Sequence, residues 1–258
     1  MKIARFSHDD DISYGVLDGD ELVLLQSDPL FAGFKPLNRR IPVEEVRLLS
    51  PVIPRSKVVG IGRNYRAHAA ELGNDVPSEP VMFFKPNTAV IGPDDPIVLP
   101  PWDDEIHHEA ELAVVISRPC KDVPLERAPE VIFGYTAAND VSARTAQRGD
   151  STWARAKGFD TSCPLGPYLV IPGDDDFDPA NARIRCAVDG ELRQDGTTAD
   201  MIFSIAEQIA YVSSVCSLLP GDVILTGTPA GVGPIQPGQR VEVDVEGIGV
   251  LANPVVRR

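Results

Sequence analysis

The stretch IHHEAELAVVIS, residues 106–117, places two glutamates inside an apolar run. Alternate side chains of a strand point to opposite faces, so Glu109 and Glu111 would share one face. The other face is apolar and carries Ala110, Leu112, Val114 and Ile116. Two carboxylates that leave water side by side repel each other, and burying them is costly unless a cation neutralises them. The stretch therefore predicts either a divalent-cation site or a solvated edge strand whose polar face carries both glutamates.

Most of the chain after residue 56 has the pattern of short strands. Runs of β-branched and aromatic residues end at Gly, Pro or a polar residue, as in KVVGIG (57–62), VMFFKP (81–86) and VIFGYTAAN (131–139). Two further stretches, RIRCAVDGELRQ (183–194) and RVEVDVEGIGVL (240–251), predict hairpins that turn at Asp-Gly and Glu-Gly. Strands and helices do not alternate regularly, which does not favour a Rossmann fold or a TIM barrel. We predict a β-dominated α+β fold.

One helix is expected, over residues 201–219. Its apolar residues recur at helical spacing at Ile202, Ile205, Ile209, Val212, Val215 and Leu219. Ser204 and Glu207 have the spacing of a capping box, and Pro220 with Gly221 would end the helix. We interpret this helix as a packing element.

The first fifty residues have the pattern of a small β-rich unit. The sequence ISYGVLDGDELVLL (12–25) has two apolar runs joined by Asp18-Gly19-Asp20, which is typical of a tight hairpin. Pro51 and Pro54 then mark a linker. We predict a small N-terminal domain over residues 1–52 and a main domain over residues 53–258.

The charge balance argues against several classes of partner. The chain has 24 Lys and Arg against 38 Asp and Glu, a net charge of −14. Such a chain repels nucleic acid and anionic lipid, and no stretch is long and apolar enough to cross a bilayer. The N-terminal residues lack the apolar run of a signal peptide, so we expect a cytoplasmic protein without nucleic-acid or membrane partners. The four widely spaced cysteines indicate neither a disulfide framework nor a zinc ribbon.

Asp140 follows the strand-like run at 131–139 and is a candidate third carboxylate for the Glu109 and Glu111 pair. Three carboxylate ligands suit hard cations such as Mg²⁺ and Mn²⁺. Alternatively, Asp140 caps a following helical turn. His107 would point in the same direction as the two glutamates in a regular strand, so a zinc or iron site with a histidine ligand is a second alternative.

Residues 65–72, YRAHAAEL, would form a helical turn that puts His68 and Glu71 on one face. A carboxylate that orients the imidazole makes a general base, although such a pair is also common on helix surfaces. Lys157 stands alone among small and aromatic residues and could stabilise an oxyanion, or be a surface lysine. The glycine-rich segment LTGTPAGVG (225–233) could bring backbone N–H groups to an anion, or form a plain turn.

Taken together and in this order, these segments resemble the fumarylacetoacetate hydrolase family over residues 57–256. The matching segments are GIGRNYRAHAAELG (60–73), EPVMFFKP (79–86), HHEAELAVVIS (107–117), GYTAANDVSARTAQ (134–147), AKGFDTSCPLGP (156–167), GELRQDG (190–196), MIFSI (201–205) and GDVILTGTPAGVG (221–233).

The resemblance implies a mixed β-roll fold and a homodimer. It implies that Glu109, Glu111 and Asp140 bind Mg²⁺ or Mn²⁺. The catalytic residues it implies are His68 and Glu71, as a water-activating dyad on a lid, and Lys157, which stabilises an enolate or oxyanion. The substrate-binding residues it implies are Arg144, Gln147 and Thr228.

The implied substrate is a small 2-oxo (keto-enol) mono- or dicarboxylic acid that chelates the metal and reacts through a metal-bound enolate. The implied reactions are hydrolysis of an acylpyruvate or fumarylpyruvate, decarboxylation of oxaloacetate, or isomerisation of 2-hydroxyhepta-2,4-diene-1,7-dioate. A different class remains open from the residues themselves: a non-catalytic β-rich protein with a structural Ca²⁺ site.

Overall fold

The computed structural model of the chain describes residues 1–171, 173 and 177–257. Strands dominate, and they form mixed sheets, so the predicted β-dominated α+β class is confirmed. The last residue of the predicted main domain, 258, lies outside the described residues. No helix in the described part of the chain is long and apolar enough to cross a membrane.

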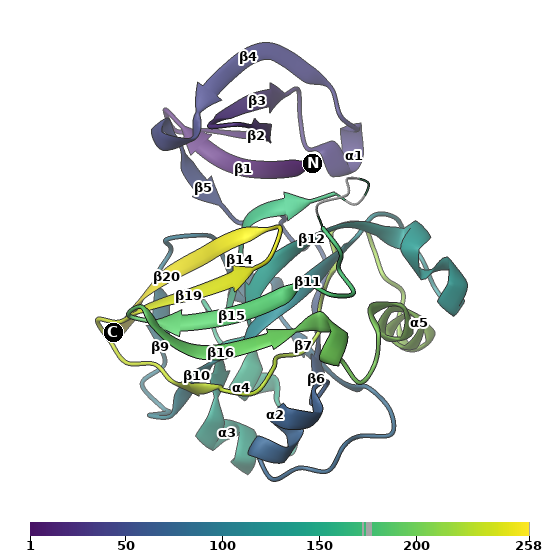
Figure 1. Ribbon diagram of the computed structural model, residues 1–258, viewed down its shortest axis with the longest axis vertical. Helices are drawn as coiled ribbons and strands as arrows, with labels where there is room; N and C mark the ends of the chain where they lie inside the picture. The colour runs from purple at the N-terminus through teal and green to yellow at the C-terminus, as the bar shows by residue number, and fades with distance from the viewer. Residues whose placement is uncertain (172, 174–176, 258) are drawn as a thin grey trace.

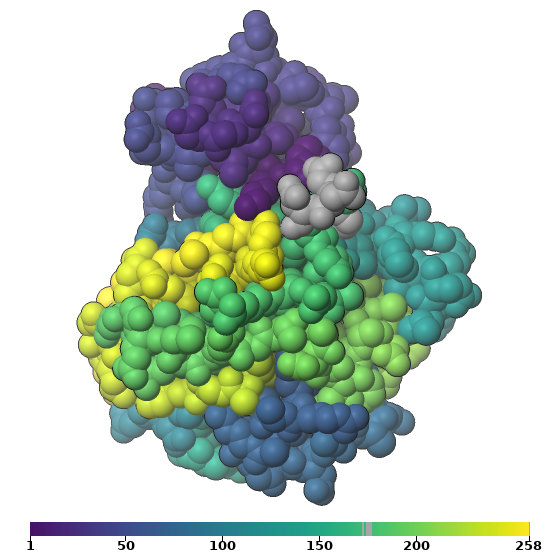
Figure 2. Space-filling view, viewed as in Figure 1, coloured from purple at the N-terminus to yellow at the C-terminus, as the bar shows by residue number. Residues whose placement is uncertain are grey.

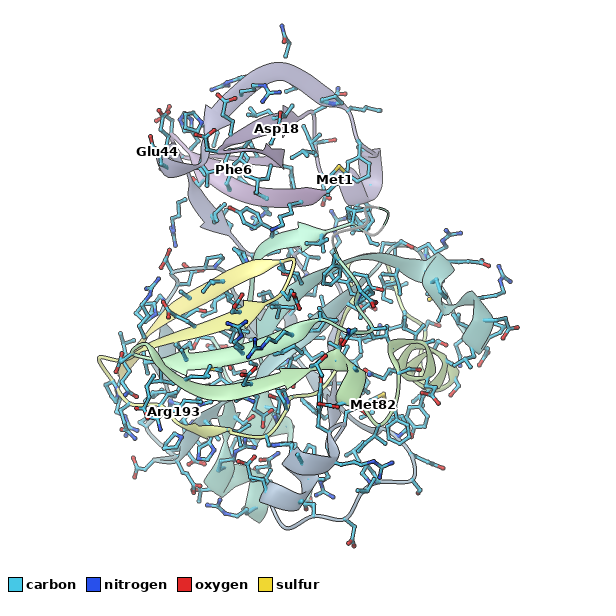
Figure 3. The ribbon with its side chains drawn as sticks, in the orientation of Figure 1. Met1, Phe6, Asp18, Glu44, Met82 and Arg193 are labelled. Atoms are coloured by element: carbon cyan, nitrogen blue, oxygen red, sulfur yellow. The ribbon has the colours of Figure 1, made fainter. Side chains whose placement is uncertain are left out.

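The N-terminal unit, residues 1–50, is a small antiparallel sheet with its own apolar core. Its elements are β1 (Lys2–His8), β2 (Asp11–Asp18), β3 (Glu21–Leu25), α1 (Pro29–Ala32), β4 (Pro36–Pro42) and β5 (Arg47–Leu49). It forms a lobe above the main body (Figures 1 and 2), and Phe6 lies fully buried inside it (Figure 3). The predicted hairpin at residues 18–20 joins β2 to β3.

The N-terminal unit continues the main sheet. Lys2 and Ile3 of β1 pair with Val170 and Leu169, which end β14 of the main body. The resulting sheet contains β6 (Val58–Gly62), β7 (Val81–Lys85), β8 (Val90–Ile91), β11 (Ala110–Ile116), β12 (Ile132–Asn139), β14 (Cys163–Val170) and β17 (Val223–Leu225) in addition to β1–β5. The two parts of the chain are therefore joined by backbone hydrogen bonds as well as by the linker.

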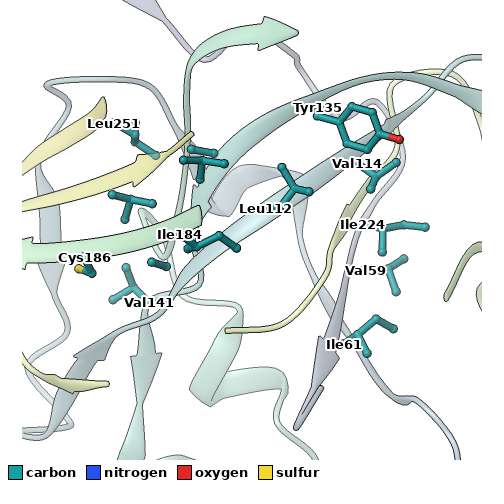
Figure 4. Packing of buried hydrophobic residues seen from close by; sticks show 14 of the residues in the cluster. Val59, Ile61, Leu112, Val114, Tyr135, Val141, Ile184, Cys186, Ile224 and Leu251 are labelled. Carbon is teal, nitrogen blue, oxygen red and sulfur yellow. The ribbon is translucent and has the colours of Figure 1, made fainter. Parts of the chain in front are cut away.

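A second sheet packs over one face of the first. It contains β9 (Ile97–Leu99), β15 (Arg183–Val188), β16 (Glu191–Thr197), β19 (Arg240–Val245) and β20 (Gly249–Arg257). Its two predicted hairpins are present, between β15 and β16 and between β19 and β20. Leu112 and Val114 of β11 pack in one core with Ile184 and Leu251 from this sheet (Figure 4). The alternate residues Ala113 and Val115 belong to a different core.

Because β11 lies between β12 and β17 and is buried on both faces, it is a central strand, and the edge-strand alternative is wrong. Just before β11 the chain forms β10 (Ile106–His108), which pairs with β13 (Ser142–Ala143) and β18 (Gly233–Pro234) in a short three-stranded sheet. The short helices α2 (Arg66–Glu71), α3 (Arg144–Gly149) and α4 (Ala154–Lys157) lie at the end of the molecule opposite the N-terminal unit (Figure 1).

The expected helix over 201–219 is shorter than predicted. The helix α5 covers Ile205–Val215 and starts with the predicted capping box of Ser204 and Glu207. It ends before Pro220 because Cys216 is extended and Leu218, fully buried, forms a β-bridge with Cys120. Pairing with a distant segment thus overrides the local helical pattern.

Candidate active site

Three carboxylates converge at the start of β11. Glu109 immediately precedes the strand, Glu111 is its second residue, and Asp140 immediately follows β12. The strands are antiparallel with Ala110 opposite Asn139, and the Asp140 backbone N–H donates to the Glu109 carbonyl oxygen at 2.9 Å. One oxygen from each carboxylate lies within 4.8 Å of the other two, and all three residues are buried. The structure therefore brings the three predicted metal ligands together.

Three cations surround this cluster, and they contact two of its members. The Lys157 Nζ lies 2.6 Å from Glu109 Oε2 and 2.7 Å from Asp140 Oδ2. Lys85 Nζ lies 2.6 Å from Asp140 Oδ1, and Arg144 Nη2 lies 2.6 Å from Glu109 Oε1. All three cations are buried. Lys157 is thus the partner of the carboxylates, and its surface-lysine alternative is wrong.

Glu111 has no cationic partner among the described residues. Its Oε2 accepts a hydrogen bond of 2.7 Å from the Gly227 backbone N–H. Burial, together with the charges of Asp140 and Glu109, raises the pKa of Glu111 well above its usual value. Burial also raises the pKa of Glu109, but Lys157 and Arg144 outweigh it and hold that pKa well below its usual range. The cluster therefore lacks positive charge at Glu111.

This arrangement fits a hard divalent cation. Three buried carboxylate oxygens within one coordination sphere are the ligands that Mg²⁺ and Mn²⁺ prefer, and a bound cation would supply the positive charge that Glu111 lacks. The described residues hold no other such cluster of His, Cys, Asp or Glu.

The histidine-containing metal site is not supported. His107 lies outside the carboxylate cluster, with its Nε2 3.6 Å from Glu105 Oε1. The alternation that would align His107 with Glu109 breaks at Glu109, because β10 and β11 belong to different sheets.

The carboxylates open into a cavity of about 400 Å³. Every predicted site residue except Glu71 lines it: His68, Glu109, Glu111, Asp140, Arg144, Gln147, Lys157 and Thr228. Arg144 Nη1 donates to Gln147 Oε1 at 2.7 Å, which leaves the Gln147 amide NH₂ to donate to a ligand. The cavity therefore combines a cation site with several hydrogen-bond donors for an anion.

His68 and Glu71 lie on α2 beside the cavity. His68 Nδ1 is 3.4 Å from Glu71 Oε2, and the Gly231 backbone N–H donates to both oxygens of Glu71 at 3.1 and 3.2 Å. Burial lowers the pKa of His68 by more than the nearby charge of Glu109 raises it. A neutral, oriented imidazole at the cavity wall can accept a proton.

The segment 225–233 does bring backbone N–H groups to anions. The anions are carboxylates of the chain itself, since Gly227 donates to Glu111 and Gly231 donates to Glu71. The plain-turn alternative is therefore wrong, and the segment orients one carboxylate of the cluster and one of the dyad.

Sequence reasoning missed Gln194, which comes from β16 in the other sheet and is fully buried. Gln194 Oε1 accepts from the Ala110 backbone N–H at 2.9 Å, and its Nε2 donates to Thr228 Oγ1 at 2.7 Å. Thr228 Oγ1 donates in turn to the Ala110 carbonyl oxygen at 2.7 Å. These two side chains hold Ala110, the residue between Glu109 and Glu111, on the side of β11 that faces away from β12, because β17 pairs with β11 only from Ala113 onward. The available signal was that Gln194 lies in the motif GELRQDG (190–196), which contributes to the family resemblance.

Sequence reasoning also missed Lys85. It ends β7 within the run VMFFKP and is 1% exposed. A lysine inside an apolar strand was the available signal, since lysine is almost never fully buried without a partner.

Two sequence profiles match the chain. The profile described as "Fumarylacetoacetate (FAA) hydrolase C-terminal" matches residues 57–256, and that described as "Rv2993c-like, N-terminal" matches residues 1–51. The chain is similar to the structure of 5-carboxymethyl-2-hydroxymuconate delta-isomerase from Mycobacterium smegmatis, with 48% identity, a TM-score of 0.91 and 100% of each chain covered.

Two further relatives bear on the chemistry. The human mitochondrial oxaloacetate tautomerase FAHD2A is 44% identical over 225 residues, which are 84% of this chain and 71% of that protein. The structure of maleylpyruvate hydrolase from Sphingobium sp. SYK-6, in complex with manganese(II) and pyruvate, is 33% identical with a TM-score of 0.81. The match covers 100% of this chain and 99% of that one.

Proposed function

The chain belongs to the fumarylacetoacetate hydrolase family, and we propose that it is a divalent-metal-dependent enzyme that acts on a small 2-oxo acid through an enolate. The observation that carries this proposal is the buried cluster of Glu109, Glu111 and Asp140 at the wall of a cavity. Family members are enzymes named as isomerases, hydrolases and tautomerases, which supports a catalytic role.

Each group of the cavity has a distinct part in this proposal. A bound Mg²⁺ or Mn²⁺ would supply Lewis-acid polarisation of the 2-oxo group. Arg144 and the Gln147 amide would orient the substrate carboxylate by charge-assisted hydrogen bonds, and Thr228 would also contact the substrate. Lys157 would stabilise negative charge that develops on the substrate oxygen.

His68 is the proton acceptor in the proposed reaction. Its imidazole would take a proton from water in a hydrolysis, or from a substrate carbon in a tautomerisation or isomerisation, with Glu71 holding the ring. Decarboxylation needs no such step, because loss of CO₂ itself generates the enolate. The residues that bind the cation are common to these reactions, and so they do not choose among them.

The metal proposal is tested by thermal melts with Mg²⁺, Ca²⁺ or EDTA, each with and without oxalate. Oxalate resembles the chelating enolate, so we expect joint stabilisation by Mg²⁺ and oxalate. Glu109→Gln should remove this stabilisation and turnover while the fold remains. Full activity of the chelator-treated protein would refute the proposal. Stabilisation by Ca²⁺ alone, without any effect of oxalate, would support the alternative of a non-catalytic protein with a structural Ca²⁺ site.

The reaction is identified by an ultraviolet assay of a small panel: acetylpyruvate, oxaloacetate, fumarylpyruvate and hydroxyheptadienedioate. His68→Ala should suppress hydrolysis more than decarboxylation, because only the former needs an activated water. Equal loss of both activities would give the dyad a different role.

We further propose that the protein works as a cytoplasmic homodimer. Sedimentation analysis of the purified protein tests the dimer, and a mass of one chain at all concentrations would contradict it.

A further inference from the structure

Arg63 is a cation of the cavity wall that the proposed chemistry does not use. It lines the cavity and is half-buried, and it makes no ion pair with any residue that the structure describes. The other two arginines of the cavity wall do have carboxylate partners: Arg144 contacts Glu109, and Arg148 contacts Glu105. Arg63 is therefore the arginine of this wall that is left for an anion from outside the chain.

The backbone holds Arg63 in an unusual conformation. Its φ is +59°, in the left-handed region that residues other than glycine seldom adopt. The next residue is fixed on both sides, because Asn64 Nδ2 donates to the Thr226 carbonyl oxygen at 2.8 Å and Asn64 Oδ1 accepts from the Phe203 backbone N–H at 2.8 Å. Strained backbone of this kind persists only where the surroundings impose it, and such positions cluster at functional sites.

The side chain of Arg63 lies on an aromatic platform. Its guanidinium carbon is 5.7 Å from the centroid of the Trp153 ring. That ring is fixed by Phe83, at 5.7 Å between centroids, and packs so closely over Gly62 that a Cβ there would lie 2.8 Å from it. A guanidinium on an aromatic face keeps its in-plane N–H donors free, so Arg63 can bind a carboxylate with two hydrogen bonds.

The charges around the cavity point to a doubly charged ligand. The cluster and the dyad contribute four carboxylates, and four cations lie in or beside the cavity, so their formal charges cancel by number: Glu71, Glu109, Glu111 and Asp140 against Arg63, Lys85, Arg144 and Lys157. A divalent ion would therefore leave an excess of two positive charges. A dicarboxylate neutralises that excess, whereas a monocarboxylate leaves half of it.

We propose that Arg63 binds the distal carboxylate of the substrate and makes the site selective for 2-oxo dicarboxylic acids over 2-oxo monocarboxylic acids. This inference rests on the proposed function, since it takes the 2-oxo end of the substrate to lie at the carboxylate cluster. Arg63 would contact the distal end of the substrate and so determine which class of 2-oxo acid binds. The residues described above would contact the 2-oxo end, where the reaction takes place.

The test compares two stable ligands that differ only at the distal group. 2-Oxoglutarate carries a carboxylate where 2-oxopentanoate carries a methyl group, and the binding of each is measured by calorimetry at saturating Mg²⁺. The wild type should bind 2-oxoglutarate more tightly. In Arg63→Gln the preference should fall by about tenfold, the size expected for a charged hydrogen bond at a half-buried site, while 2-oxopentanoate binds as before.

Two control variants make the comparison specific. Arg63→Lys should retain part of the preference, because the charge remains. Arg66→Gln removes an exposed arginine three residues further on, outside the cavity lining, and should leave the preference unchanged.

The failures of the two proposals are distinguishable. If neither ligand binds the wild type in a Mg²⁺-dependent manner, the proposed function itself is wrong. If both bind but Arg63→Gln keeps the wild-type preference, the inference about Arg63 is overturned. It is equally overturned if Arg148→Gln abolishes the preference and Arg63→Gln does not.

Discussion

Replacing Lys85 with methionine tests how charge is balanced in the site. Lys85 is 1% exposed, its Nζ lies 2.6 Å from Asp140 Oδ1, and it also donates to the Lys157 carbonyl oxygen. Methionine has a similar length but neither charge nor donors. The variant therefore leaves one oxygen of a buried carboxylate without its cation.

The expected loss of stability follows from the contacts that remain. Removing one partner of a buried ion pair costs about 3–5 kcal/mol, and the lower end applies because Asp140 keeps Lys157 at 2.7 Å. For a chain of this size, about 3 kcal/mol corresponds to a melting temperature lower by roughly 6–12 °C in EDTA. A divalent cation restores positive charge beside Asp140, so the deficit should shrink in Mg²⁺.

The affinity for Mg²⁺ should also change. Unit charges roughly 5 Å apart interact by about 3 kcal/mol at an effective dielectric constant of about 20. Removing the Lys85 charge therefore removes a repulsion of at least this order from any cation in the cluster. We expect Lys85→Met to bind Mg²⁺ roughly a hundredfold more tightly than the wild type, since each 1.4 kcal/mol corresponds to about a tenfold change in affinity.

The assay is a set of thermal melts in EDTA and across a Mg²⁺ titration. Lys57→Met is the matched control, because Lys57 Nζ also lies 2.6 Å from a buried carboxylate, that of Asp222, away from the cavity. It should lose stability equally in EDTA and in Mg²⁺. If Lys85→Met shows the same Mg²⁺-independent loss, or weaker Mg²⁺ binding, the account of the charge balance is refuted.

Three further predictions concern other parts of the molecule. Burial lowers the pKa of His107 to about 4, so the folded state binds its proton less readily than the unfolded chain and stability falls as pH drops from 6.5 toward 4. By pH 5 the loss in the free energy of unfolding amounts to about 2 kcal/mol. Urea unfolding at pH 7 and at pH 5 should show a smaller loss of stability for His107→Gln than for the wild type. An equal loss in the two proteins would contradict this prediction. Burial raises the pKa of Cys163 and Cys186 to about 12, so a thiol reagent at pH 8 should label them only after unfolding, and equal labelling rates for all cysteines would refute this. Ser204→Ala removes the N-cap of α5 and should lower the free energy of unfolding by about 1 kcal/mol, whereas Ser214→Ala, at an exposed position of the same helix, should have little effect.

The carboxylate cluster was predictable because it depends on local geometry. The pattern of alternation predicted Glu109 and Glu111 on one side, and they do lie together although Glu109 immediately precedes β11; Asp140 immediately follows β12, the strand that pairs with β11. The hairpins were predictable for the same reason, since Asp189 and Gly190 both have the positive φ that their turn requires.

What could not be predicted depends on contacts between distant segments. Lys85 donates a hydrogen bond to Asp140, which is 55 residues away in the chain. Gln194 accepts one from Ala110, which is 84 residues away. The end of α5 at Val215 is set by pairing of Leu218 with Cys120. No local pattern specifies these partners, because each arises from how the sheets pack.

The pairing of β1 with β14 has a consequence for any shortened form of the protein. Without residues 1–52, Leu169 and Val170 would lose their pairing with β1, so that one edge of β14 would be open while β12 remains on the other, and Ile3 would no longer cover the apolar cluster that contains Leu169. The uncovered N–H and C=O groups would form a template on which a second molecule could add a strand. We expect a chain that begins at residue 53 to self-associate in solution even with its catalytic groups intact. The N-terminal unit would then serve to prevent association of the protein through the edge of β14.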